Sequence, residues 1–239
     1  MKKVSKIVMG VLIFILSVSA FGKGKIYVGT NAEFPPFEYL QDGKIVGFDI
    51  DLINAIGKEI NKDIVIKDMA FDGLIPALQM NKVDIVIAGM TASEDRKAAV
   101  NFSSPYYEAN QVIILNENNK DIKGFKDLNG KIVGVVLGFT GDLVISEMKD
   151  VNSKKYNASY GAIMELQNNK IDAVVLDSQT AINYVKHNKG IKLCDSKGDL
   201  EEYAIAISKN NPKLLSEINK AIEELKKNGT YDKLIEKYM

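Results

Sequence analysis

The sequence of 239 residues is poor in cysteine and histidine, and its charge has no dominant sign. Cys194 is the only cysteine, so no disulfide can form within the chain and stability must come from packing. His187 is the only histidine, and its polar neighbourhood, residues 186–189, is typical of a surface residue. Basic and acidic residues number 31 each, without the basic patch that nucleic-acid-binding proteins carry. We therefore expect no nucleic-acid partner.

Arginine is almost absent, because Arg96 is the single arginine among the 31 Lys and Arg residues. A guanidinium presents a planar fork of donors that fits a carboxylate or phosphate, which lysine cannot do. Arg96 follows a predicted buried strand ending at residue 87, at the start of a predicted helix for which Thr91 and Glu94 would form a capping box. Two interpretations stay open here: an anion-binding arginine near a helix N-terminus, or a surface arginine paired with Glu94 or Asp95.

The first 22 residues predict a secretory leader. A basic head precedes an apolar run over residues 7–18, about a dozen residues and short of the ~20 that a membrane-spanning helix needs. Small residues follow, so cleavage after Ala20 or after Gly22 fits. Loss of the three leader lysines leaves 28 basic against 31 acidic residues. No cysteine follows the run, so we expect a periplasmic protein without a lipid anchor at that place.

A repeat predicts two similar halves. Residues 78–87 are echoed by residues 166–175, and each copy has the pattern of a helix end, an Asn/Lys turn and a buried strand. A Gly-Lys-Ile strand start lies upstream of each, at residues 24–26 and 130–132. Short apolar strands between helices predict mostly parallel sheets whose ligands bind beyond the carboxyl ends of the strands. We expect strands at 26–29, 64–66, 132–136 and 173–176, and helices at 49–59, 71–80, 142–148 and 161–168.

Polar and aromatic residues follow the predicted strand ends. Residues 30–39 hold two prolines and several aromatic rings, residues 138–142 form a turn before a helix, and Asp177 ends a strand. If the halves face each other, one cleft holds Arg96, helix N-termini, a carboxylate and aromatic walls. That set suits a zwitterion, a free α-amino acid. Taken singly, Asp177 could instead cap a helix over residues 178–184, and the aromatic residues could be ordinary core.

These stretches together resemble the polar amino-acid-binding proteins of bacterial ABC importers, solute-binding protein family 3, over nearly the whole chain from Lys25 to Met239. The matching stretches are Phe34-Pro35-Pro36-Phe37-Glu38, Gly47-Phe48-Asp49-Ile50-Asp51, Gly73-Leu74-Ile75-Pro76-Ala77-Leu78, Ala88-Gly89-Met90-Thr91-Ala92-Ser93-Glu94-Asp95-Arg96-Lys97, Phe102-Ser103-Ser104-Pro105-Tyr106-Tyr107 and Asn228-Gly229-Thr230-Tyr231-Asp232-Lys233-Leu234. The resemblance implies an α/β fold of the two-lobe periplasmic-binding-protein type II class, joined by a two-strand hinge.

The resemblance also implies a role for each site residue. The ligand α-carboxylate would be held by Arg96, Thr91 and Thr140, and the α-ammonium by Asp177 and the backbone carbonyl near Gly89. The ligand side chain would be lined by Phe34, Phe71, Asn31 and Glu33. No catalytic residue, metal or cofactor is implied.

The implied lobes are residues 23–109 with 204–239, and residues 110–203, with hinge strands near residues 108–111 and 203–206. The implied partners are a free amino acid and the permease and ATPase subunits of an ABC importer, with the receptor itself a monomer.

The substrate is only partly indicated. Family members that bind arginine, lysine or histidine often have an aspartate where this chain has Asn31, and glutamine-type members often have a lysine where it has Val136 and Leu137. Glu33 and the mildly acidic balance favour a basic amino acid, with glutamine or another polar amino acid as the alternative.

Two other functions use the same fold. A dehydratase for small carboxylates would need a positioned acid or base, and His187 is expected at the surface. A sensory module would need a membrane span and an output domain, and the sequence stops at Met239. We expect a receptor rather than an enzyme.

Overall fold

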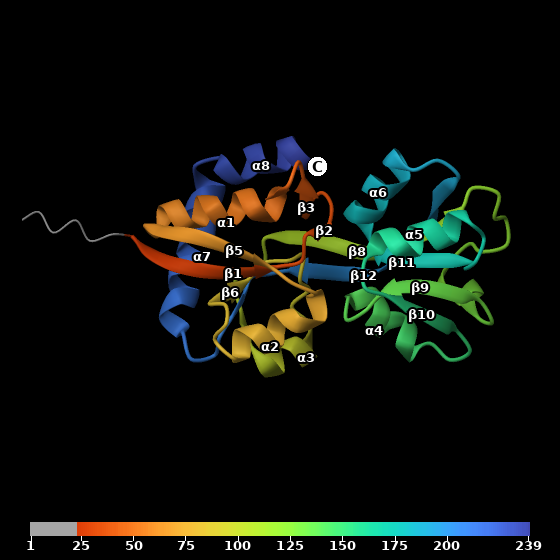
Figure 1. The fold of residues 1–239 in the computed structure, drawn as a ribbon, viewed down its shortest axis with the longest axis horizontal. Helices are drawn as coiled ribbons and strands as arrows, with labels where there is room; N and C mark the ends of the chain where they lie inside the picture. Colours follow the sequence, from red (N-terminus) through yellow and green to blue (C-terminus); the bar gives the residue numbers. More distant parts are fainter. Residues whose placement is uncertain (1–22) are drawn as a thin grey trace, which may run out of the picture.

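The computed structural model describes residues 23–239, so the predicted leader lies outside the described residues. No helix between residues 23 and 239 is long and apolar enough to cross a membrane. Two lobes lie side by side, and each contains a five-stranded sheet (Figure 1).

Lobe 1 contains the sheet β5-β1-β6-β13-β7. Strands β5, β1 and β6 are parallel, and β13 is antiparallel to both β6 and β7, so four of the five strands point the same way. Helices α1 and α8 lie on one side of this sheet and α2 and α3 on the other (Figure 1). The strands are β1 (Gly24–Thr30), β5 (Lys62–Asp68), β6 (Ile85–Val86), β7 (Asn101–Phe102) and β13 (Ala206–Ile207). The helices are α1 (Phe48–Glu59), α2 (Leu74–Gln79), α3 (Glu94–Ala99), α7 (Pro212–Lys227) and α8 (Thr230–Tyr238).

A separate small sheet in lobe 1, with the order β2-β3-β4, follows β1. Its strands are β2 (Glu33–Phe34), β3 (Glu38–Gln41) and β4 (Lys44–Val46). It includes most of residues 30–39, the loop that was predicted to place aromatic residues near the site.

Lobe 2 contains the sheet β10-β9-β11-β8-β12, in which β10, β9 and β11 are parallel and β8 is antiparallel to its neighbours β11 and β12. The strands are β8 (Tyr107–Asn116), β9 (Ile132–Val136), β10 (Asn152–Tyr156), β11 (Ala173–Asp177) and β12 (Ile191–Tyr203). The helical segments are the 3-10 helix η2 (Phe125–Leu128), α4 (Thr140–Glu147), α5 (Ser159–Gln167) and α6 (Ser178–His187).

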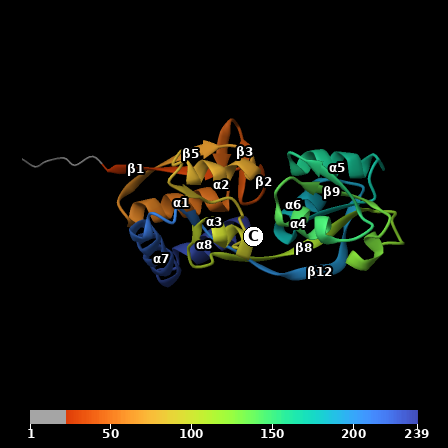
Figure 2. The same cartoon turned by 90° about the horizontal axis from the view of Figure 1, so that it is seen from below.

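The lobes are joined by two long strands. Strands β8 and β12 pair antiparallel, with Tyr107 opposite Tyr203, and extend from lobe 1 into lobe 2 (Figure 2). The chain leaves lobe 1 through β8 and returns through β12, so that α7 and α8 pack in lobe 1 with α1. The predicted fold class, two α/β lobes with a two-strand connection, is confirmed.

The repeat seen in the sequence is a repeat in the structure. In each copy, the turn asparagine has a positive φ, 55° at Asn81 and 54° at Asn169, a conformation that asparagine tolerates better than most residues. The aspartate that follows accepts the backbone amide of a neighbouring strand, Asp84 from β1 at 2.8 Å and Asp172 from β9 at 2.7 Å. Matching turns and matching carboxylate contacts show that the two lobes share one local design.

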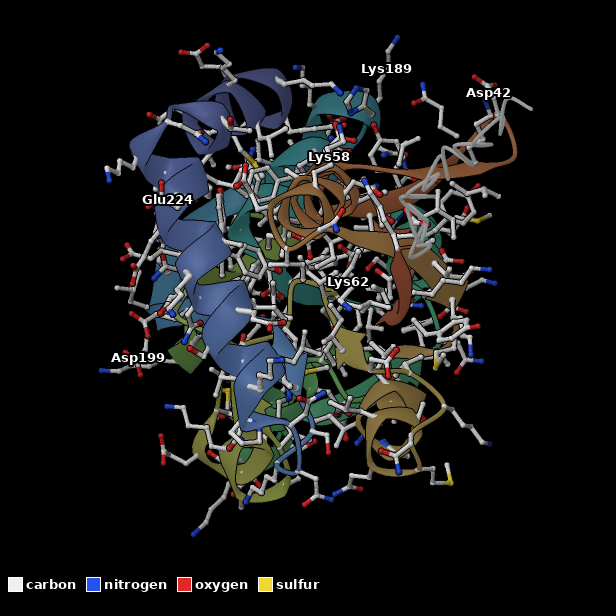
Figure 3. The ribbon with its side chains drawn as sticks, turned by 90° about the vertical axis from the view of Figure 1, so that its left-hand side faces the viewer. Asp42, Lys58, Lys62, Lys189, Asp199 and Glu224 are labelled. Atoms are coloured by element: carbon white, nitrogen blue, oxygen red, sulfur yellow. The ribbon has the colours of Figure 1, made fainter. Side chains whose placement is uncertain are left out.

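Apolar residues lie between the helices and the sheets. In lobe 1, Leu52, Ile53 and Ile56 of α1 are fully buried, as expected for a helix whose apolar positions recur every three or four residues. Charged residues of the surrounding helices are exposed, among them Lys58 of α1 and Glu224 of α7, which are labelled in Figure 3. The buried face of α1 holds this helix against β5 and against the helices α7 and α8 of lobe 1.

Three predicted helices differ locally from the structure. The predicted helix over residues 71–80 is a 3-10 turn, η1 (Phe71–Gly73), followed by α2. Pro76 has no amide hydrogen, so it fits only in the first turn of a helix, and α2 begins two residues before it. Helices α4 and α5 each begin two residues earlier than predicted, at Thr140 and Ser159.

The predicted capping box at Thr91 and Glu94 is wrong. The N-cap of α3 is Ser93, whose Oγ accepts the backbone amide of Arg96 at 3.4 Å. Thr91 lies in a β-bridge with Tyr203, and its hydroxyl donates to Glu201 at 2.8 Å. Thr91 is therefore engaged in the connection between the lobes and does not cap the helix.

Candidate functional site

Arg96 lies on α3 and is buried, with 8% of its surface exposed. Its Nη1 donates to the carbonyl oxygen of Thr91 and its Nη2 to that of Gly138 in lobe 2, both at 2.9 Å. The surface pairing considered from sequence is wrong, because Glu94 pairs with Lys97 instead. Burial lowers the pKa of Arg96, and the charges of Asp177 and Glu201 oppose that shift. The guanidinium is thus held at the junction of the lobes by neutral carbonyl groups.

Asp177 ends β11 in lobe 2 and is 3% exposed. It occupies the N-cap position of α6, but its side chain makes no capping hydrogen bond. Instead its Oδ2 accepts from the hydroxyl of Tyr203 at 2.5 Å. Burial raises the pKa of Asp177, whereas Tyr203 and the positive charge of Arg96 act to lower it. The predicted alternative of a side-chain cap is wrong.

Arg96 and Asp177 are close enough for the charge of each to shift the pKa of the other, but they do not form an ion pair. Among residues 23–239, neither side chain takes part in an ion pair within 4.0 Å. Buried charges are normally paired, because removing an ion from water is costly. A buried cation and a buried anion that are kept apart can each take one end of a zwitterion.

Two hydroxyl groups connect the lobes beside Arg96. Thr140, at the start of α4, donates to Thr91 Oγ1 at 3.1 Å, and Thr91 donates in turn to Glu201 Oε2 at 2.8 Å. Gln111 also donates to Glu201 Oε2, at 3.3 Å. Thr91 and Thr140 were predicted from the sequence, whereas Glu201 and Gln111 were missed. The expected hinge strand near residues 108–111 was a signal for Gln111, and Glu201 had none.

Glu201 is a titrating group within this network. Burial, followed by the charge of Asp177, raises the pKa of Glu201 from 4.5 to about 7, against opposing hydrogen bonds from Thr91 and Gln111. Between those two pKa values the folded protein holds a proton that the unfolded chain has lost. The contribution of Glu201 to the free energy of unfolding therefore falls as the pH rises from about 4.5 to about 7.

Three aromatic rings meet at the same junction. Phe139 of lobe 2 lies with its ring centroid 5.2 Å from that of Phe34 and 4.4 Å from that of Phe71, both in lobe 1. The guanidinium carbon of Arg96 lies 5.2 Å from the Phe71 ring centroid. Phe34 and Phe71 were predicted, whereas Phe139 was missed although it stands between Gly138 and Thr140 in the sequence.

Gly89 lies directly against the ring of Phe34. Its φ is 52°, and a Cβ there would lie 2.4 Å from Cε1 of Phe34. Its amide donates to Asp49 Oδ2 at 2.9 Å, which also accepts from the hydroxyl of Tyr106 at 2.7 Å. Burial raises the pKa of Asp49 to about 6 and that of its fully buried neighbour Glu38 well above the usual range. No side chain fits at Gly89 without moving Phe34.

Asn31 and Glu33 differ in their surroundings. Asn31 is 5% exposed, and its Nδ2 donates to the carbonyl of Met69 at 3.1 Å. Its Oδ1 is buried without a hydrogen-bond partner among residues 23–239, so it can accept a bond from a donor. Glu33 is exposed on β2, outside the buried group.

The two-lobed fold, with separated buried charges and hydroxyl groups at the junction, defines the class as a two-lobe binding protein. The family model for bacterial extracellular solute-binding proteins, family 3, matches residues 26–239. The chain belongs to this family, as its motifs indicated. Members of this family are binding proteins of transporters.

Several relatives are similar to this chain over most of their length. A probable histidine-binding protein of Campylobacter jejuni is 38% identical over 213 residues, 88% of this chain and 83% of the relative. The arginine-binding extracellular protein ArtP of Bacillus subtilis is 35% identical over 236 residues, 93% of this chain and 89% of the relative. The structure of an ancestral arginine-binding protein bound to arginine has a TM-score of 0.88 at 47% identity, covering 91% of this chain and 99% of that one.

Proposed function

We propose that this chain is an extracytoplasmic receptor that binds a free basic amino acid, arginine first, between its two lobes and delivers it to the permease and ATPase subunits of an ABC importer. The observation that carries the proposal is the pair Arg96 and Asp177, both buried at the junction and neither ion-paired within residues 23–239. An α-amino acid supplies both missing partners in one molecule.

The α-groups of the ligand fix its orientation. Arg96 binds the α-carboxylate as a fork, with the hydroxyl groups of Thr91 and Thr140 as additional donors. Asp177 binds the α-ammonium together with the carbonyl of Gly89. Because these residues come from both lobes, a bound amino acid links lobe 1 to lobe 2.

The side chain of the ligand extends toward the aromatic residues. Phe34 and Phe71 offer ring faces that attract a cation by ~0.5–2 kcal/mol, depending on how far it is desolvated. The unpartnered Oδ1 of Asn31 accepts a hydrogen bond from a guanidinium or ammonium. Glu33, exposed on β2, adds negative charge outside the buried group. Relatives named for arginine and for histidine support a basic ligand.

Ligand exchange requires the lobes to separate. We assign residues 23–109 and 204–239 to lobe 1 and residues 110–203 to lobe 2, with β8 and β12 as the hinge between them. Hinge closure around a ligand is the mode of periplasmic binding proteins. The receptor acts as a monomer, outside the cytoplasm, after removal of residues 1–22.

Thermal unfolding with each of the twenty amino acids tests the proposal. Protein that has been unfolded and refolded to remove carried-over ligand should be stabilised most by arginine, lysine or histidine. Ligand at 100 times its Kd adds about 2.7 kcal/mol, a rise in Tm of roughly 5–10 °C for a chain of this size.

Agmatine is the matched control, because it keeps the guanidinium of arginine and lacks the α-carboxylate. It should leave the Tm unchanged if Arg96 binds that carboxylate. A larger shift with glutamine than with all three basic amino acids would refute the basic ligand and keep the amino-acid receptor. No shift with any amino acid would refute the receptor itself.

A further inference from the structure

Three consecutive residues of lobe 2, Gly138, Phe139 and Thr140, each contact lobe 1, and we call them the interlobe turn. The carbonyl of Gly138 accepts from Arg96 Nη2 at 2.9 Å. The hydroxyl of Thr140 donates to Thr91 Oγ1 at 3.1 Å. The turn thus occupies Arg96 and Thr91, the two lobe 1 side chains that the proposed function assigns to the ligand carboxylate.

The ring of Phe139 uses the groups assigned to the ligand side chain. It contacts Phe34 edge to face and lies tilted against Phe71, with centroid distances of 5.2 Å and 4.4 Å. Rings at these separations are in direct contact, so no further group fits between Phe139 and either of them. Phe139 is 5% exposed, which places it inside the junction.

The interlobe turn is held in place by its own lobe. Gly138 has a φ of 78°, and its amide donates to Asp142 Oδ2 at 3.0 Å. Asp142 is fixed by Lys155, whose ammonium lies 2.8 Å from Oδ1. The amide of Asp142 returns a bond to the carbonyl of Phe139 at 3.0 Å. Lobe 2 therefore presents the ring and the carbonyl as a preformed unit.

We propose that the interlobe turn is an internal competitor of the ligand, with Phe139 in the place of the ligand side chain between Phe34 and Phe71. This inference rests on the proposed function. Binding requires Phe139 to leave the two rings, so the measured affinity is the intrinsic affinity multiplied by the fraction of molecules in which Phe139 has left them. Phe139 is then a residue that sets affinity and limits the size of the side chain that binds.

The substitution Phe139→Ala tests the competition, because the affinity for the ligand should rise rather than fall. Calorimetric titration of the refolded full chain with arginine should give an affinity roughly three to ten times higher than that of the parent. Phe139→Leu, which keeps an apolar side chain of smaller reach, should give a smaller gain and serves if the alanine variant does not fold. Phe125→Ala is the control, because it removes a half-buried ring from lobe 2 outside the junction and should leave the affinity unchanged.

An affinity of either Phe139 variant that is equal to or below that of the parent would overturn the inference, since Phe139 would then be a neutral neighbour or a wall of the ligand site. The parent titration separates this result from the proposed function. If the parent binds arginine and the variants bind no tighter, only the competition is wrong. If the parent and the variants bind no amino acid, both proposals fall.

Discussion

Arg96→Lys is the sharpest test of the site, because it keeps the positive charge and removes the fork. In the structure, Nη1 and Nη2 reach carbonyl groups on opposite lobes, both at 2.9 Å. One ammonium cannot replace two parallel donors with fixed spacing. The lysine variant should therefore fold and still fail to hold a carboxylate in two places.

The size of the loss follows from what the fork does. A hydrogen bond to a charged group contributes ~1.5–3 kcal/mol, and breaking a buried charge pair costs ~2–5 kcal/mol. Replacing a bidentate contact by a single one should lower the affinity for arginine by at least ~2 kcal/mol, about 30-fold. A salt-screened surface contact would contribute less than ~1 kcal/mol.

Calorimetry with refolded protein measures this loss, and a melting curve of the same sample reports on folding. Lys97→Gln is the matched control, because it removes a half-exposed charge from the next position of α3 and should leave binding unchanged. If Arg96→Lys binds arginine within threefold of the parent, the assignment of the carboxylate to Arg96 is wrong.

Three further substitutions probe the rest of the site. Asp177→Asn should lower the affinity for arginine at least tenfold with little change in Tm, because the α-ammonium of the ligand loses its counter-charge; unchanged affinity with a lower Tm would indicate a structural role instead. Glu201→Gln should flatten the fall in Tm between about pH 4.5 and 7, because the parent loses ~1–3 kcal/mol of unfolding free energy over that range after discounting for the partial exposure of Glu201; an unaltered pH profile would contradict the raised pKa. Gly89→Ala should lower both Tm and affinity by displacing Phe34, and an alanine variant that equals the parent in both would exclude that contact.

Sequence alone determined the fold class and the main elements. The repeat at residues 78–87 and 166–175 predicted two similar lobes, because Asn-Lys turns and buried strands are set by nearby residues. The same local logic located Arg96 and Asp177 at strand or helix ends, where ligands gather in open sheets. The starts of α4 and α5 were misplaced by two residues, because their N-cap residues, Phe139 and Ala158, make no side-chain capping hydrogen bond and so leave no capping signal in the sequence.

Only the tertiary structure decided what these residues contact. Arg96 reaches the carbonyl of Gly138 across 42 residues of sequence, and Thr91 reaches Glu201 across 110. Such contacts form where two lobes meet, and no periodicity or spacing within one segment records them. Phe139 had no signal of its own, because one aromatic residue in a turn is ordinary until the opposite lobe places two rings against it. The sequence therefore determined the parts of each lobe, and packing between the lobes determined the site.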